Sequence, residues 1–209
     1  NLFNLEKNYS NKNIDTFHLA EGPGGFIEAL CYLRKNPLDR YYGMTLIDNS
    51  DTSVPGWKKS DLFLQKNPNV IIEKGCDGTG DLYQYKNLKR CIHKYKNSID
   101  LITADGGFDF SIDYDKQENL ALRLIFSQIA FAISLQKKGG DFILKVFDLF
   151  FESSVDLIYL LSCFYSQVFI IKPNTSRYAN SEKYVICKNF KYSDTENISN
   201  KFISIFRVL

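Results

Sequence analysis

The chain has 209 residues, a mass of 24.1 kDa and a hydrophobic content of 44%, which suits one domain with a sizeable core. Its net charge of +2 is too small to point to a nucleic-acid partner, although the pI near 8.2 does not argue against one. No apolar run approaches the roughly 20 residues of a membrane span, so we expect no membrane partner.

The first half of the chain predicts strands that alternate with helices. A short helix over residues 1–12 precedes a strand over 16–20, the turn Gly22–Gly25 and a helix that starts at Phe26. Further on we expect a strand over 41–47, a short helix over 60–66, a strand over 70–72, the glycine-rich turn 75–81 and a helix over 82–95.

The second half continues this alternation. A strand over 100–104 stops at Asp105, and a long apolar helix spans 117–137. Gly139 and Gly140 are expected to break that helix before a buried strand containing Lys145. The remaining elements are a helix over 153–165, a strand over 167–172, a loop over 173–182, a strand over 183–187 and a surface helix over 194–206.

Strands that alternate with helices predict an α/β fold, in which a mostly parallel sheet is covered on both faces. The last two strands are separated only by a loop, which favours an antiparallel hairpin at one edge of the sheet. The chain starts at Asn1 rather than Met. We therefore expect residues 1–209 to be a single domain taken from a longer protein.

Lys145 is the most unusual residue of the buried strand GGDFILKVFDLF. An ammonium group in a central strand costs several kcal/mol unless it is paired or loses its proton. The alternative is an edge strand whose lysine points to water. Acidic residues after neighbouring strands favour a central strand in which Lys145 is paired with a carboxylate.

The glycine turn after the first strand is typical of a nucleotide-type α/β unit, in which the backbone approaches a ligand and a helix N-terminus offers free N–H groups. Ligands of open α/β sheets bind at the carboxyl ends of the strands. Asp81, Asp105, Lys145 and Glu182 are all expected at that edge, beside the turn. Taken singly, Asp105 is equally compatible with a plain turn, Asp81 with a helix cap and Glu182 with a solvent-facing position.

Several segments carry a family resemblance: HLAEGPGGF, YYGMTL, GCDGTGD, DLITADGGFDF, GGDFILKVFDLF and KPNTSRYANSEKYVICK. They resemble the signature segments of FtsJ/RrmJ-type ribose 2'-O-methyltransferases, most of all the mRNA cap 2'-O-methyltransferases of eukaryotes and large DNA viruses. The resemblance runs from Phe17 to Lys188. It implies a Rossmann-like methyltransferase fold with seven strands and S-adenosylmethionine as methyl donor.

The family also implies a Lys-Asp-Lys-Glu tetrad around the target ribose. The last three members correspond to Asp105, Lys145 and Glu182. The first lysine is a departure, because Asn1 stands where it is expected; Lys7 is the nearest alternative, and a lysine upstream of Asn1 is another.

For the methyl donor, the resemblance implies a pocket made by the glycine turn and by acidic residues after the strands. Asp81 would accept a hydrogen bond from the adenine amino group, with Asp77 as the alternative. Asp48 would bind the ribose of the methyl donor. Asp105 would lie close to the sulfonium. The complete set expected at the donor is Gly22, Pro23, Gly24, Gly25, Phe26, Asp48, Asp77, Asp81 and Asp105.

RNA contacts are expected around the loop over 173–182. Lys172, Arg177 and Lys183 would neutralise phosphates, and Tyr178 would stack on a base; an ordinary solvated face is the alternative for each. Trp57 lies in a polar loop, where packing is favoured over a role in stacking on the cap. His18 and His93 match no ligand spacing, so no metal site is predicted.

Together these features predict an S-adenosylmethionine-dependent 2'-O-methyltransferase acting on the cap-proximal nucleotide of mRNA, with capped mRNA as partner and further domains or capping-machinery proteins as additional candidates. The alternatives are methylation of ribosomal or transfer RNA ribose and a catalytically inactive RNA-binding subunit. An odd number of cysteines, five, without CxxC spacing favours free, mostly buried thiols in a reducing intracellular compartment, either the nucleus or a viral cytoplasmic factory.

Overall fold

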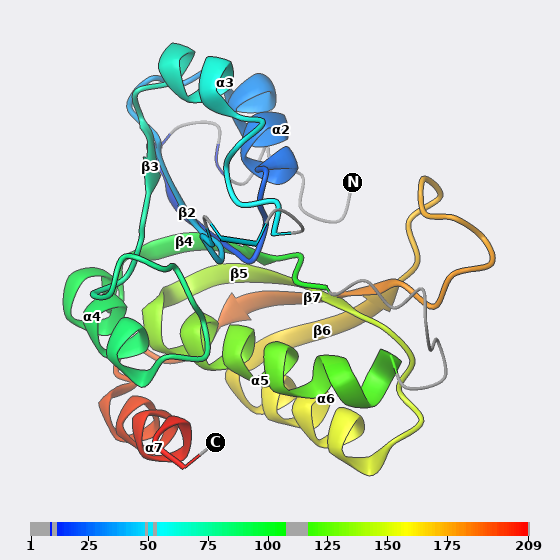
Figure 1. The fold of residues 1–209 in the computed structure, drawn as a ribbon. Coiled ribbons are helices and arrows are strands. Elements are labelled where there is room, and N and C mark those ends of the chain that lie inside the picture. The colour runs from blue at the N-terminus through cyan, green and yellow to red at the C-terminus, as the bar shows by residue number, and fades with distance from the viewer. Residues whose placement is uncertain (1–8, 10–11, 49, 52–53, 108–116, 209) are drawn as a thin grey trace.

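The computed structural model describes residues 9, 12–48, 50–51, 54–107 and 117–208. The short helix predicted over residues 1–12 falls almost wholly outside them. The described strands are β1 (Asp15–Leu19), β2 (Arg40–Met44), β3 (Val70–Ile72), β4 (Ile99–Ala104), β5 (Gln136–Val146), β6 (Tyr165–Ile171) and β7 (Lys183–Phe190) (Figure 1). The described helices are α2 (Gly25–Arg34), α3 (Asp61–Lys66), α4 (Tyr85–Tyr95), α5 (Gln117–Leu135), α6 (Glu152–Phe164) and α7 (Glu196–Phe206).

The strands form one seven-stranded sheet in the order β3-β2-β1-β4-β5-β7-β6. Strands β1 to β5 pair in parallel, whereas β7 is antiparallel to both of its neighbours, β5 and β6. The predicted mostly parallel sheet with a hairpin at its edge is confirmed. The antiparallel strand is the inner member of that hairpin, and β6 forms the edge.

The pairing of β5 with β7 sets which side chains share a face. Lys145 lies opposite Tyr184, and Ile143 lies opposite Ile186. Side chains alternate along a strand, so these four residues share one face of the sheet. The opposite face of the two strands packs into the larger of two hydrophobic clusters, described below, through Leu144, Val146, Val185 and Cys187.

Two hydrophobic clusters hold the layers together. The larger one joins the sheet to α4, α5, α6 and α7, and the smaller one joins it to α2 and α3. Helix α5 is long and apolar enough to cross a membrane by length and composition, but 72% of that stretch is buried inside the fold. It lies between α4, α6, α7 and the sheet (Figure 1), which is the position of a core helix.

The start of β5 differs from the prediction. The strand begins at Gln136, directly after α5, and Gly139 and Gly140 lie inside it rather than before it. Gly139 has a φ of 83°, and a Cβ on Gly140 would come within 2.8 Å of the Asp100 carbonyl oxygen. The two glycines therefore lie in a stretch where the pairing of β4 with β5 is irregular. The prediction that they break the helix was wrong, because α5 ends before them.

The C-terminal helix is a surface helix, as predicted, with one buried face. α7 buries Ser199, Phe202 and Phe206. The Phe126 ring of α5 lies 5.9 Å from the Phe202 ring and 5.8 Å from the Phe206 ring. The helix is thus amphipathic, and its apolar face completes the core.

All five cysteines are free, as predicted, but only Cys91 and Cys187 are buried. The expectation of mostly buried thiols was therefore wrong for Cys31, Cys76 and Cys163. Burial raises the pKa of the Cys31 thiol to about 11, so this half-buried thiol stays protonated at neutral pH.

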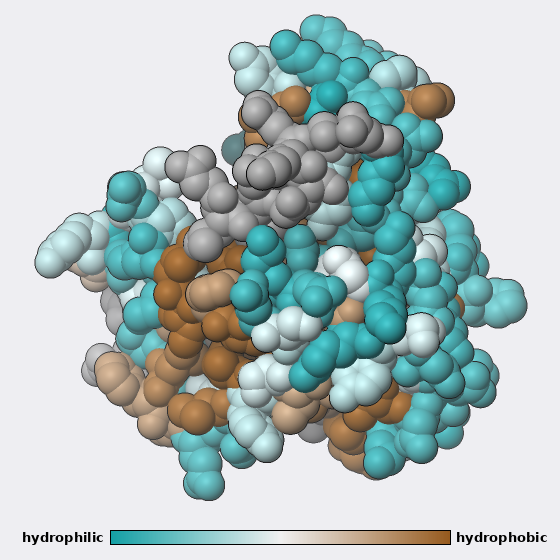
Figure 2. All heavy atoms as spheres, turned by 180° about the vertical axis from the view of Figure 1, so that it is seen from behind, coloured by the Kyte–Doolittle hydropathy of each residue, from teal (hydrophilic) through white to brown (hydrophobic). Residues whose placement is uncertain are grey.

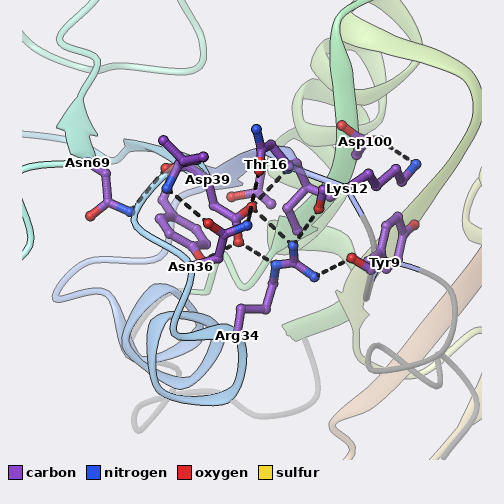
Figure 3. A network of polar contacts seen from close by, with 12 residues as sticks. Tyr9, Lys12, Thr16, Arg34, Asn36, Asp39, Asn69 and Asp100 are labelled. Carbon is purple, nitrogen blue, oxygen red and sulfur yellow. Dashed lines mark hydrogen bonds and ion pairs between the residues drawn. The ribbon is translucent and has the colours of Figure 1, made fainter.

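A network of polar contacts lies at the amino end of the parallel strands (Figure 3). The fully buried carboxylate of Asp39 accepts hydrogen bonds from the Ile14 backbone N–H at 2.9 Å, from the Arg34 guanidinium and from the Tyr41 hydroxyl at 3.0 Å. The Asp100 carboxylate pairs there with Lys12 at 3.0 Å and with Lys137 at 2.7 Å. These charges lie at the end of the strands opposite to the glycine turn.

Candidate active site

The glycine turn lies where β1 ends and α2 begins. Gly24 has a φ of 104°, in the left-handed region that favours glycine. Gly22 is required for a close approach, because a Cβ there would overlap the carbonyl oxygen of Gly56. Gly25, in contrast, faces open space. What approaches Gly22 in this structure is therefore the loop before α3.

Glu21 anchors the turn to the helix. Its Oε1 accepts hydrogen bonds from the backbone N–H groups of Phe26 at 2.6 Å and Ile27 at 3.1 Å. Its Oε2 accepts one from the Thr103 hydroxyl at 2.6 Å and lies 3.2 Å from His18 Nδ1. A buried carboxylate thus satisfies N–H groups that a helix start leaves unpaired.

Sequence reasoning missed Glu21, which is almost fully buried. The available signal was its position: an acidic residue directly before a glycine turn and a helix is well placed to accept the first helical N–H groups. His18, for which no function was predicted, is fully buried and hydrogen-bonded to Thr16, Thr103 and Glu21.

Lys145 lies on a central strand and is paired, as the favoured interpretation required. Its Nζ is 3.1 Å from Asp105 Oδ1, and its side chain is 13% exposed against 31% for Asp105. The Tyr184 hydroxyl donates to the same Asp105 oxygen at 3.1 Å. The ends of β4, β5 and β7 thus converge on one carboxylate oxygen.

The protonation equilibria of this group follow from its burial. Burial raises the pKa of Asp105, while the Lys145 ammonium and the hydrogen bond from Tyr184 act against the increase. Burial, together with the Asp105 carboxylate, raises the pKa of Tyr184 far above its ordinary value. Tyr184 therefore keeps its proton and donates it to Asp105 in a hydrogen bond.

Glu182 lies at the same edge of the sheet, but among the described residues no hydrogen bond or ion pair joins it to Lys145. Its Oε1 accepts a hydrogen bond from the Ser176 hydroxyl at 2.9 Å, and it lines a cavity with Phe26 and Tyr184. The Phe26 ring lies 6.2 Å from the Tyr184 ring. Glu182 and Phe26 therefore line one cavity together with Tyr184, the residue that donates to Asp105.

Three of the acidic residues expected at the donor, namely Asp48, Asp77 and Asp81, make local hydrogen bonds. Asp48 Oδ1 accepts from the Ser50 backbone at 2.8 Å, and Asp77 Oδ1 accepts from the Thr79 backbone at 3.0 Å. Asp81 Oδ1 accepts from the Tyr83 backbone at 2.8 Å, but α4 begins at Tyr85 with Gln84 as its N-cap, so the helix-cap interpretation of Asp81 was wrong. Within the described part of the chain, none of these three carboxylates forms an ion pair.

The residues expected to bind RNA lie on or beside the loop over 173–182. Lys172 Nζ donates to the Asn180 carbonyl at 2.8 Å and to the Glu182 carbonyl at 2.9 Å, so it ties the loop together. Arg177 is exposed, and Tyr178 is 99% exposed. Lys183 pairs with Asp148 at 2.8 Å.

Trp57 packs on Gly24 and Gly43, within the smaller hydrophobic cluster, so the prediction of loop packing is confirmed. Lys7 falls outside the described residues, and its role as the first tetrad lysine stays a prediction.

A glycine turn after β1, acidic residues after β2, β3 and β4, and an antiparallel β7 beside β5 define a Rossmann-like methyltransferase fold. Many solved structures resemble the chain, and two of them illustrate the shared fold. One, described as a ribosomal RNA methyltransferase from Plasmodium falciparum, has a TM-score of 0.59 and 21% identity, covering 90% of this chain and 94% of its own. Human methyltransferase-like protein 13 in complex with SAH has a TM-score of 0.57 and 10% identity, covering 93% and 80%.

The chain belongs to the FtsJ-like methyltransferase family, whose model matches residues 2–190. It is 33% identical over 189 residues to cap-specific mRNA (nucleoside-2'-O-)-methyltransferase 2 of Drosophila melanogaster, covering 85% of this chain and 27% of that protein. It is 38% identical over 180 residues to the corresponding enzyme 1 of Homo sapiens, covering 83% and 21%. The chain thus spans about a quarter of the length of these relatives.

Proposed function

We propose that this chain is the catalytic domain of an S-adenosylmethionine-dependent RNA 2'-O-methyltransferase that acts on the cap-proximal nucleotide of mRNA. The observation that carries the proposal is the Lys145–Asp105 pair at 3.1 Å, at the carboxyl ends of β4 and β5 and one strand from the glycine turn. Relatives that match most of the chain are cap-specific mRNA 2'-O-methyltransferases, which supports the choice of substrate.

The chemistry of the glycine-turn side of the site fits the donor. S-adenosylmethionine, when bound, supplies an electrophilic methyl group on a positively charged sulfur, and it also carries an ammonium and an adenine amino group. Asp48, Asp77 and Asp81 present carboxylates without ion-pair partners among the described residues. These residues, with the turn Gly22–Gly25, would hold the donor, and Asp105 would complement its charge.

The other side of the site would orient the ribose. Lys145 projects from β5 and donates N–H groups, so it can hold the oxygen of the 2'-hydroxyl in line for attack. Asp105 holds Lys145, and Tyr184 holds Asp105 from the neighbouring strand. Since an ammonium has no free lone pair, the hydroxyl proton leaves to water while Lys145 fixes the oxygen.

The test is methyl transfer to a short capped RNA by Lys145→Ala. We expect transfer to fall by a factor of about 100 or more, since positioning contributes many kcal/mol to such reactions. Donor binding, measured by calorimetry, should persist.

Lys137→Ala is a matched control. Lys137 is also a β5 lysine paired with a β4 aspartate, Asp100, but at the amino end of the strand. Its loss should leave transfer per folded molecule unchanged. Equal loss of activity in both variants would refute the assigned role of Lys145. Equal transfer to capped and uncapped RNA would refute the choice of substrate.

A further inference from the structure

A cavity of about 340 Å³ lies beside Lys145, and no step of the proposed reaction uses it. It is lined by Phe26 of α2, Ile143 of β5, Ile171 of β6, Tyr184 and Ile186 of β7, and residues of the loop over 173–182. Figure 2 looks from the side opposite to Figure 1 and shows hydrophobic residues gathered around a hollow. Elements far apart in the sequence therefore build one apolar surface.

The strand register explains why the cavity adjoins the reactive lysine. Ile143 lies two residues before Lys145 on β5, so both side chains emerge on the same face, roughly 7 Å apart along the strand. Tyr184 lies opposite Lys145, and Ile186 lies opposite Ile143. On the edge strand, Ile171 pairs with Tyr184. The floor of the cavity thus continues directly from the Lys145–Tyr184 pair.

The lining separates into apolar walls and a polar mouth. The walls are the Phe26 ring and three isoleucines, whereas Thr175, Ser176 and Glu182 lie at the loop. A nucleobase has this same division, with two apolar π faces and a polar edge. Apolar and aromatic walls hold a base by contact with its faces, which every base possesses.

We infer that this cavity holds the base of the nucleotide whose ribose is methylated. The inference rests on the proposed function and adds how the acceptor nucleotide is held: by the faces of its base, and with little selection among A, G, C and U. A ribose whose 2'-hydroxyl meets Lys145 then has its base over Ile143 and Ile186, beside Phe26.

The test combines an altered RNA with altered walls. The capped RNA is prepared with its usual acceptor nucleotide or with an abasic one that keeps the ribose 2'-hydroxyl. In the unmodified protein, loss of the base should lower kcat/KM for RNA about tenfold, as expected for one stacked base. The four standard bases should differ by much less than that.

Ile143→Phe and Ile171→Phe fill the cavity from two different strands, so one informative variant remains if the other fails to fold. Each should lower kcat/KM for the intact RNA toward the abasic level and leave the abasic RNA nearly unchanged. Ile170→Phe is the matched control: Ile170 is the neighbour of Ile171 on β6, its side chain points to the opposite face, and it is 48% exposed.

The possible results separate the inference from the proposed function. If the unmodified protein methylates intact and abasic RNA equally, the cavity does not hold the acceptor base and the inference is wrong, while the proposed reaction stands. The inference is equally wrong if the filled variants slow both RNAs by the same factor. If the unmodified protein methylates neither RNA, the proposed reaction is itself refuted, and the inference with it.

Discussion

At the scale of single residues, Asp105 connects the two halves of the site. Its Oδ1 receives both the Lys145 ammonium and the Tyr184 hydroxyl, each at 3.1 Å. Its burial opposes the ionised form on which both contacts depend. The folded protein therefore binds a proton at Asp105 more tightly than the unfolded chain does. The stability from this group is present at low pH and is lost as the pH rises through its raised pKa.

The pH dependence of methyl transfer should reveal this raised pKa. As the pH falls through it, Asp105 takes up a proton and releases Lys145, so activity falls at a higher pH than an ordinary aspartate would give. Tyr184→Phe removes a hydrogen bond that lowers the pKa of Asp105. The acid limb of the kcat/KM profile should then move to still higher pH. An unmoved or lowered limb would contradict this account of Asp105.

Only some contacts of the site could be predicted from the sequence. The cost of a buried ammonium and the acidic residues after neighbouring strands favoured placing Lys145 and Asp105 at one edge of the sheet, and the family resemblance implied that the two residues belong together. The Tyr184 contact was not predictable, because it depends on the register of β7 against β5. The local bonding of Asp48, Asp77 and Asp81 depends on turn geometry that the sequence pattern does not specify.

At the scale of elements, the start of α2 depends on one carboxylate. Glu21 accepts hydrogen bonds from two backbone N–H groups of the helix and from the Thr103 hydroxyl of β4. It therefore ties the glycine turn to the strand that leads to Asp105.

Glu21→Gln should lower the free energy of unfolding by about 2 kcal/mol, the usual worth of hydrogen bonds to a charged group. It should also weaken binding of S-adenosylmethionine, because the turn loses its anchor. Urea unfolding and calorimetry measure the two effects. Glu28→Gln, an exposed position in the same first helical turn, is the control. Similar stability losses in the two variants would argue against the anchoring role.

The Asp39 network predicts a purely structural effect at the other end of the strands. Asp39→Asn leaves the Arg34 guanidinium, only 7% exposed, without its charge partner. Breaking a buried pair in this way costs about 3–5 kcal/mol. Asp15→Asn removes the partner of the exposed Arg40 instead, and it should cost less than about 1 kcal/mol. Denaturant unfolding would show the difference; equal costs would contradict it.

Element order and type followed from hydrophobic periodicity, and most boundaries fell close to the predicted ones. The exceptions have physical causes. The irregular pairing of β5 lets Gly139 and Gly140 sit inside a strand, where a pattern of glycines predicts a break. What the prediction of a surface helix left out is the buried face of α7, whose partners on α5 lie far away in the sequence.

At the scale of the whole molecule, the amino and carboxyl ends of the parallel strands carry different groups. The amino end holds the ion pairs of Asp39 and Asp100, whereas the carboxyl end holds the glycine turn, the Lys145–Asp105 pair and the cavity. That residues 1–209 form a single domain of a larger protein stays a prediction.

The cross-strand placement of Lys145 and Tyr184 limits how related sequences can vary in length. A one-residue insertion within β7 would turn Tyr184 to the opposite side of the sheet and bring an aliphatic neighbour in its place. An insertion in the loop over 173–182 would leave that pairing intact. Homologous chains should therefore keep a constant spacing between the tyrosine and the end of its strand, a limit that this pairing does not place on the length of the loop.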